Sequence, residues 1–87
     1  MGPEMQIEWR TRAIRDMRRL DTRDRERIIA KIEQYASDPS ALANQVVMLS
    51  GSRYRRLRVG NYRVIFHAES AGIMTVLRVR HRREAYE

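Results

Sequence analysis

Arginine is the residue type through which this 87-residue sequence could do chemistry, because its arginines gather near the C-terminal end. Six of them recur at close spacing in two short segments: Arg56, Arg58, Arg63, Arg78, Arg80 and Arg82. A guanidinium is a planar fork that grips phosphate oxygens in pairs. It does not readily lose its proton, so it would orient a phosphate and stabilise a pentacoordinate transition state. The pattern therefore predicts chemistry on a phosphodiester.

The sequence lacks the residues that other common kinds of catalysis need. There is no cysteine nucleophile, no glycine-rich phosphate loop and no histidine pair spaced as in acid–base ribonucleases. Carboxylates that could bind Mg²⁺ are few, because residues 53–87 contain only Glu69, Glu84 and Glu87. We therefore expect no metal and no cofactor. A tyrosine could serve as the base only if neighbouring arginines first lowered its ordinary pKa, which is near 10.

The positive charge of the chain is concentrated in the same region. Residues 1–52 contain nine basic and eight acidic side chains, whereas residues 53–87 contain nine arginines against three glutamates. Such an excess is typical of a surface that faces a polyphosphate. Two other interpretations remain open: a merely solvated basic surface, or a basic face that meets an acidic partner.

The elements that position these side chains follow from the hydrophobic pattern. Residues 6–9 alternate as in a short strand, and residues 11–20 carry apolar side chains at helical spacing. A second helix begins at Asp21 or Thr22, either of which can cap it. It ends near Asp38, because a proline follows and disfavours helix in the residue before it. The short link between the helices predicts an antiparallel helical hairpin.

The rest of the chain is predicted to be mostly β-structure. Residues 40–45 are expected to form a loop and 46–49 an extended segment, followed by strands at 54–59, 62–67 and 73–80. This order predicts an α+β domain: an N-terminal strand, a helical hairpin, and an antiparallel β-meander with the helices packed on one sheet face.

A two-residue turn at Gly60-Asn61 fixes which residues of the hairpin face each other. Val59 then lies opposite Tyr62, and Arg58 lies opposite Arg63. The apolar side is expected to meet the helices and consists of Leu57, Val59, Tyr62, Val64 and Phe66. The other side carries Arg56, Arg58 and Arg63, with Tyr54 at its start. Two arginines opposite each other repel by about 0.2–1 kcal/mol, so we interpret the pair as a site that an anion completes.

The last predicted strand adds to this face. Three arginines point to one side if the strand extends that far: Arg78, Arg80 and Arg82. Leu77 and Val79 point to the other side. Alternative interpretations stay open, since Arg78 could lie along the sheet and Arg82 and Arg83 could belong to a frayed C-terminus.

Compartment and domain content follow from composition. No apolar run approaches the roughly 20 residues of a membrane span, and no signal peptide is recognisable. The absence of cysteine fits a reducing compartment, so we expect a cytoplasmic location and no membrane partner. Residues 5–87 are expected to form one domain, and residues 1–4 a leader outside it.

Two segments resemble the signature half of the RelE/ParE superfamily of toxin–antitoxin toxins. They read YRRLRVGNYRVIF at residues 54–66 and VLRVRHRREAY at residues 76–86. The upstream helical hairpin matches too, so the resemblance covers the chain from Met5. Because the motifs are paired, the resemblance is specific, and it implies a RelE-like fold.

The resemblance also implies an activity. The RelE-like branch cuts messenger RNA in the ribosomal A site without metal, by attack of the ribose 2′-hydroxyl on the adjacent phosphate. Arg56 and Arg63 would contact the scissile phosphate, and Arg82 would assist the leaving group. Tyr86 would stack on or activate the nucleotide. Tyr54 stands where some members have a second lysine, which leaves the identity of the base open.

Further contacts and partners belong to the same expectation. Six residues are expected to bind RNA around the four catalytic ones: Tyr54, Arg58, Arg78, Arg80, His81 and Arg83. A cognate antitoxin is also implied, as an acidic or amphipathic segment that folds over the helices or the arginine face. The main alternative is a ParE-like toxin that inhibits DNA gyrase by binding protein, without nuclease activity. A third is a non-toxic RNA-binding module.

Overall fold

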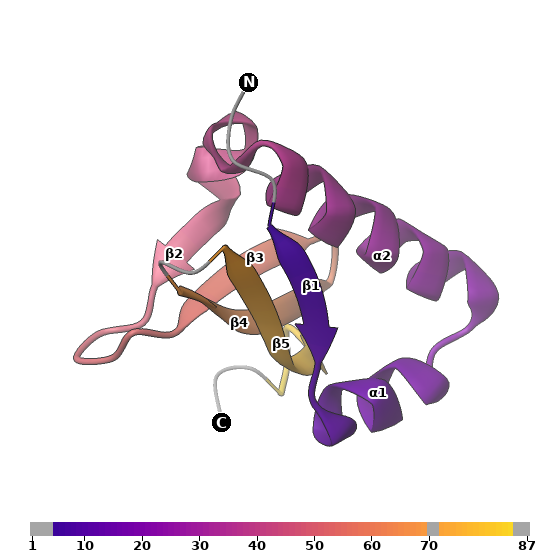
Figure 1. The fold of residues 1–87 in the computed structure, drawn as a ribbon. Helices are drawn as coiled ribbons and strands as arrows, with labels where there is room; N and C mark the ends of the chain where they lie inside the picture. Colours follow the sequence, from indigo (N-terminus) through magenta and orange to yellow (C-terminus); the bar gives the residue numbers. More distant parts are fainter. Residues whose placement is uncertain (1–4, 70–71, 85–87) are drawn as a thin grey trace.

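The computed structural model, which describes residues 5–69 and 72–84, has three helices and a five-stranded sheet (Figure 1). The helices are α1 (Thr11–Arg18), α2 (Thr22–Ser37) and the 3-10 helix η1 (Pro39–Gln45). The strands are β1 (Gln6–Trp9), β2 (Val46–Met48), β3 (Arg55–Val59), β4 (Tyr62–Glu69) and β5 (Ile73–His81). Their order in the sheet is β1-β5-β4-β3-β2, and only β1 and β5 pair in parallel. The predicted α+β arrangement is confirmed.

The helix boundaries follow from local hydrogen bonds. Asp21 caps α2, since its Oδ1 accepts a hydrogen bond from the Asp24 backbone N–H at 2.8 Å. The prediction of a loop over residues 40–45 was wrong, because these residues continue as η1. Pro39 has the backbone torsion of a first helical turn, and the Ser40 hydroxyl donates to the Asp38 carboxylate at 2.7 Å. The proline ring and this hydrogen bond both favour the tight 3-10 turns that begin here.

The core lies between the helices and one face of the sheet. The helices contribute Ala13, Met17, Ile28, Ile32, Tyr35, Ala36 and Leu42. The sheet contributes Leu57, Val59, Val64, Phe66, Met74, Val76 and Val79. Tyr35 meets Phe66 edge to face, with ring centroids 5.1 Å apart. Burial of alternate residues in β3 and β4 leaves Arg56, Arg58 and Arg63 on the face opposite the helices. Arg55 lies on the helix side, where its Nη1 donates to the Tyr35 hydroxyl at 3.4 Å.

The β3–β4 register agrees with the prediction. Val59 pairs with Tyr62 and Arg58 with Arg63 across the Gly60-Asn61 turn, where Gly60 has a φ of 56°. That φ lies in the left-handed region that glycine adopts without strain.

A bulge interrupts the alternation of β5. Ile65 pairs with Arg78 but Phe66 pairs with Val76, so Leu77 is the extra residue. Val76 and Val79 are therefore both buried, whereas Leu77 lies at the surface beside Arg78. The prediction that Leu77 and Val79 share a side was wrong for this reason. The strand also ends at His81, so alternation does not place Arg82.

The outer edge of β5 is shared by β1 and α1. β1 pairs with β5 as far as Val76. Beyond that point, the backbone N–H of Val79 is bound by the side chain of Asp16 from α1. The Asp16 carboxylate accepts hydrogen bonds from the Val79 N–H at 2.9 Å and from Arg78 Nε at 2.8 Å. In Figure 1, α1 accordingly lies beyond the end of β1, alongside β5.

None of the helices within residues 5–69 and 72–84 is long and apolar enough to cross a membrane.

Candidate functional site

Three arginines lie side by side across the face of the sheet opposite the helices. Arg63 of β4 pairs with Arg58 of β3 on one side and with Arg80 of β5 on the other. Neighbouring strands are about 4.8 Å apart, so these side chains leave the backbone close together. Arg58 and Arg63 form no ion pair with any described residue, and Arg80 reaches Glu84 at 3.9 Å. We call Arg58, Arg63 and Arg80 the arginine row.

A small depression adjoins the arginine row. Its volume is about 200 Å³, and it is lined by Asn44, Gln45, Val47, Arg56, Arg58 and Arg63. Arg56 comes from the neighbouring row of the sheet, where it pairs with Val47 and Ile65. The space is below the usual size of a cofactor site but admits a phosphate group. We call it the arginine notch.

Hydrogen bonds hold Arg63 at the hairpin turn. Its Nη1 donates to the carbonyl oxygens of Gly60 at 3.0 Å and of Tyr62 at 2.9 Å. A guanidinium has five N–H donors, so other donors of Arg63 stay available for an anion. The backbone N–H of Arg82 donates to the Asn61 carbonyl at 2.7 Å. The structure therefore brings Arg82 to the same turn as Arg63.

Aromatic rings accompany the arginines on this face. Tyr54, whose exposed fraction is 37%, precedes β3 and has its ring centroid 5.9 Å from that of His67 in β4. Alternation along the strand places Tyr54 on the same side as Arg56. Rings beside cations are the usual means of binding unpaired bases of a single strand.

Several residues predicted for the site lie elsewhere. Arg78 is held at the sheet edge by Asp16, and this hydrogen bond raises the pKa of Arg78 against the opposing effect of burial. His81 packs against Tyr62 on the helix side, with ring centroids 5.5 Å apart. Its Nδ1 accepts from the backbone N–H of Arg83, which lies in an exposed turn.

The tyrosine predicted for catalysis, Tyr86, lies outside the described residues. Among the described tyrosines, Tyr62 is unsuited to act as a base. Burial raises its pKa above 10, and so does the hydrogen bond from its hydroxyl to Asp24 Oδ2 at 3.2 Å. A general base needs a shift in the opposite direction.

Sequence reasoning missed three lining residues of the arginine notch: Asn44, Gln45 and Val47. Asn44 and Gln45 end η1, and Val47 belongs to β2. Their only signal was an amide pair just before an extended segment. Antiparallel pairing of β2 with β3 is what brings them beside Arg56.

Metal ligation has no candidate in the described part of the chain. No group of three or more histidine, aspartate or glutamate side chains is placed there so that it could hold an ion.

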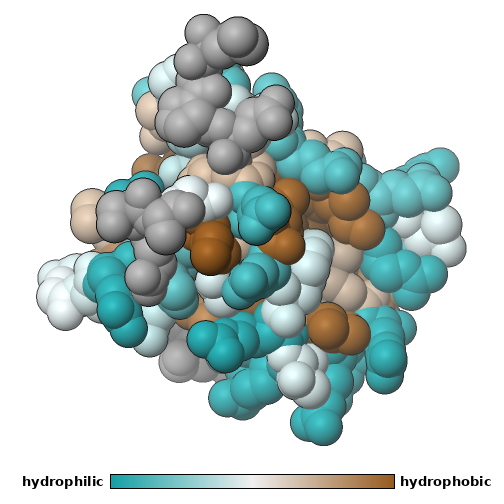
Figure 2. All heavy atoms as spheres, in the orientation of Figure 1, coloured by the Kyte–Doolittle hydropathy of each residue, from teal (hydrophilic) through white to brown (hydrophobic). Residues whose placement is uncertain are grey.

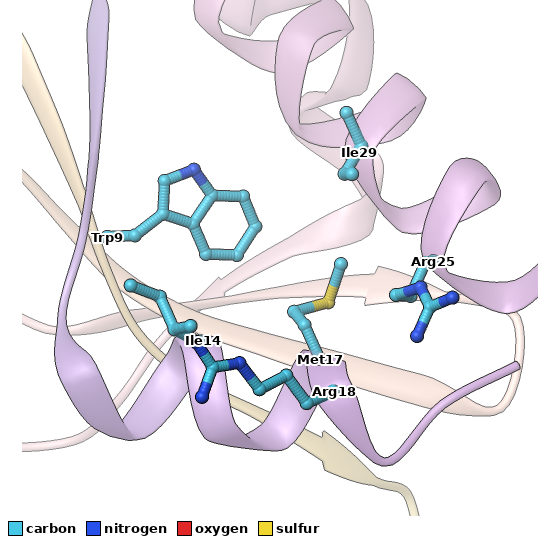
Figure 3. Close-up of a pocket in the computed structure, with 6 residues that line it drawn as sticks. All are labelled: Trp9, Ile14, Met17, Arg18, Arg25 and Ile29. Atoms are coloured by element: carbon cyan, nitrogen blue, oxygen red, sulfur yellow. The ribbon is translucent and has the colours of Figure 1, made fainter. Parts of the chain in front are cut away.

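An apolar groove lies on another side of the molecule, between β1, α1 and α2 (Figure 3). Its volume is about 450 Å³, and its lining residues are Trp9, Ile14, Met17, Arg18, Arg25 and Ile29. Ile14 and Ile29 are each 40% exposed although both are large and apolar. Hydrophobic surface is visible between the two helices in Figure 2. Exposed apolar side chains gathered in one groove are typical of surfaces that bind a partner.

The sequence matches one protein family. The profile described as the ParE toxin of the type II toxin–antitoxin system parDE matches residues 7–86. No curated protein matches the sequence significantly.

Several solved structures share the fold. A chain of the RelB–RelE antitoxin–toxin complex from Methanococcus jannaschii is 24% identical, with a TM-score of 0.73, over 92% of this chain and 95% of that one. A chain of the archaeal RelE–RelB complex from Pyrococcus horikoshii OT3 is 18% identical, with a TM-score of 0.76, over 90% of this chain and 94% of that one. A chain of the intact Escherichia coli RelBE toxin–antitoxin complex is 22% identical, with a TM-score of 0.70, over 88% of this chain and 95% of that one. At such identities the likeness establishes the architecture, including the hairpin that carries the arginines.

Proposed function

The chain belongs to the ParE toxin family of type II toxin–antitoxin systems, within the RelE/ParE superfamily, and we propose that this toxin is a ribosome-dependent, metal-independent endoribonuclease. Its substrate is messenger RNA in the ribosomal A site. The observation that carries the proposal is the arginine row, with Arg56 across the arginine notch. Repulsion between Arg58 and Arg63 within the arginine row is relieved when a phosphate chain binds there.

The proposed reaction is an internal transesterification. The ribose 2′-oxygen attacks the adjacent phosphorus, the bond from phosphorus to the 5′-oxygen breaks, and the products are a 2′,3′-cyclic phosphate and a 5′-hydroxyl end. Arg63 orients the scissile phosphate, and Arg56 stabilises the charge of the pentacoordinate transition state. Arg82 assists the leaving oxygen from the same hairpin turn. Tyr86 is the proposed base or stacking residue.

The other wall of the arginine notch supplies a means of selection. Asn44 and Gln45 each carry both a donor and an acceptor, so they can hydrogen-bond to a base edge or a ribose hydroxyl. Tyr54 supplies a ring for stacking next to it. In this proposal the arginines bind the phosphate, and the amides of Asn44 and Gln45 select the nucleotide.

A cognate antitoxin is part of the proposal. The M. jannaschii and P. horikoshii relatives are complexes of RelE with RelB. In this chain the apolar groove fits an amphipathic antitoxin helix, whose apolar side would cover Ile14 and Ile29. Acidic residues on its border would meet Arg18 and Arg25.

A second candidate function is supported by the family description itself, which names ParE. Under it the toxin inhibits DNA gyrase by binding protein, and the arginine row serves as a contact surface. Such an inhibitor has no need of Arg56, Arg63 and Arg82 gathered around one hairpin, and for this reason we favour the nuclease.

One pair of assays separates the candidates. The purified protein is added to ribosomes stalled on a defined message, and cleavage is mapped by toeprinting; the same preparation is added to a gyrase supercoiling assay. The nuclease predicts new cuts within the A-site codon and unchanged supercoiling. Intact message with inhibited supercoiling would establish the gyrase inhibitor instead. Neither effect, with no growth arrest on expression, would leave a non-toxic RNA-binding module.

A further inference from the structure

A second group of arginines lies on α1, outside the arginine notch. Arg12, Arg15 and Arg19 recur at intervals of three and four, so they share one side of the helix and its C-cap. Together with Asp16 and Arg78 they line a depression of about 280 Å³. We call Arg12, Arg15 and Arg19 the α1 cluster.

The α1 cluster lacks internal compensation. Asp16 is the one acidic residue that lines the depression, and its carboxylate is already bound by Arg78 and the Val79 N–H. The three arginines form no ion pair or hydrogen bond through their side chains with any described residue. Like charges at this spacing destabilise a helix. The position of Arg15 and Arg19 at the C-terminal end of α1 favours the helix, but it does not require three cations around one depression.

The α1 cluster is continuous with the arginine row. Arg78 lines the depression on α1 and lies two residues before Arg80, which ends the arginine row on β5. A band of guanidinium groups thus runs from β3 across β4 and β5 to α1. Figure 2 shows hydrophilic surface gathered along the lower edge of the molecule, over α1. A band over three strands and a helix can contact more than one phosphate of a nucleic-acid backbone.

The lining of the depression indicates the kind of polyanion. It contains no aromatic ring on which an unpaired base could stack, in contrast to the face that carries Tyr54 and His67. It also has no apolar floor for a peptide, in contrast to the groove of Ile14 and Ile29. Double-helical RNA is recognised mainly through phosphates and shape, without stacking.

We propose that the α1 cluster binds the phosphate backbone of double-helical RNA, as an anchoring surface separate from the site that cuts. This inference rests on the proposed function, which makes RNA the target. A folded RNA or ribonucleoprotein then offers a duplex to α1 while a single strand enters the arginine notch.

The test compares two double variants of the full chain in binding to an RNA duplex of about 16 base pairs. Arg15→Gln with Arg19→Gln removes two charges from the α1 cluster. Arg23→Gln with Lys31→Gln removes the same charge from α2, at positions that line neither the depression nor the arginine notch. We expect the first variant to bind more weakly and to lower the slope of log affinity against log salt by about two. The control should keep the slope of the unchanged protein.

Equal slopes for both double variants would overturn the proposal, since net charge alone would then explain binding. So would loss of binding to phosphatidylserine vesicles or polyglutamate in the first variant with duplex binding intact. Because the readout is binding, it does not depend on cleavage. Absence of A-site cuts by the unchanged protein would refute the nuclease alone.

Discussion

At the scale of single residues, the site depends on side chains that stay uncompensated within the protein. Arg58 and Arg63 face each other without an acidic partner among the described residues, and Arg63 is held by backbone carbonyls that leave its charge intact. Tyr62 differs from them, because its half-buried hydroxyl has a partner within the protein and donates to Asp24. The first arrangement suits ligand binding and the second suits packing.

Arg63→Ala should abolish most of the cleavage while leaving the fold intact. The side chain is half-buried on the sheet face opposite the core, and its hydrogen bonds go to turn carbonyls that a change to alanine leaves in place. Loss of its contact with the transition state should cost at least about 3 kcal/mol, or roughly two orders of magnitude in rate. Single-turnover cleavage on programmed ribosomes measures the loss, and circular dichroism checks the fold. Near-normal cleavage would remove Arg63 from the site.

Asp24→Asn should lower the pKa of Tyr62 toward 10. The variant removes the carboxylate that accepts the phenol proton and repels the phenolate, but it leaves the contribution of burial. A raised pKa in the folded state stabilises the protein below pH about 10, and this stabilisation is lost as pH rises through the folded pKa. Ultraviolet titration, with Tyr62→Phe to identify the signal, measures the shift. A pKa unchanged by Asp24→Asn would show that Asp24 does not contribute, and would leave burial with the charges of Asp21 and Glu84 as the causes.

At the scale of elements, the arginines are aligned by strand pairing, and α1 is fixed to the sheet by one carboxylate. Asp16 binds both Arg78 and the Val79 N–H at the edge that β1 leaves uncovered. The bulge at Leu77 lies next to this contact. These features set the position of α1, and with it both the α1 cluster and one wall of the apolar groove.

Asp16→Ala should destabilise the protein more than Arg78→Ala does. The first variant leaves the Val79 N–H without its acceptor and should cost about 2–3 kcal/mol. The second leaves that hydrogen bond in place, with Arg12 and Arg15 still near the carboxylate, and should cost about 1 kcal/mol. Urea denaturation gives the free energy of unfolding of each variant. Equal losses would mean that the backbone contact contributes nothing.

At the scale of the whole molecule, three surfaces differ in chemistry: two cationic surfaces adjoin along β5, and an apolar groove lies on another side. The arginine notch is cationic and bordered by rings, the α1 cluster is cationic without rings, and the groove between the helices is apolar. An antitoxin bound in the groove would leave the arginines chemically intact. Inhibition would then come from covering or crowding the RNA path.

Ile29→Asp should weaken the complex with the antitoxin while the free toxin still folds. Ile29 is 40% exposed, so the free protein loses little burial, whereas a buried charge in the occupied groove is costly. We expect the Kd to rise by about 30-fold, or about 2 kcal/mol. Calorimetry with the cognate antitoxin measures it, and Arg58→Gln is the control. A loss confined to the control would place the antitoxin on the arginine face.

The sequence by itself determined the order of elements, the hairpin register and the arginine side of β3 and β4. These are local properties, because a two-residue turn fixes pairing and alternation fixes sides. Arg58 opposite Arg63 followed from them directly. The catalytic and RNA-binding roles assigned to single arginines and to Tyr86 stay predictions.

Only the tertiary structure decided which distant segments meet. Parallel pairing of β1 with β5, the bulge at Leu77 and the capture of Arg78 by Asp16 join residues far apart in sequence, and no local spacing encodes them. The amides of Asn44 and Gln45 reach the arginines through β2 pairing in the same way. Burial selects these contacts among many chain paths, since each must satisfy backbone groups and fill the core at once.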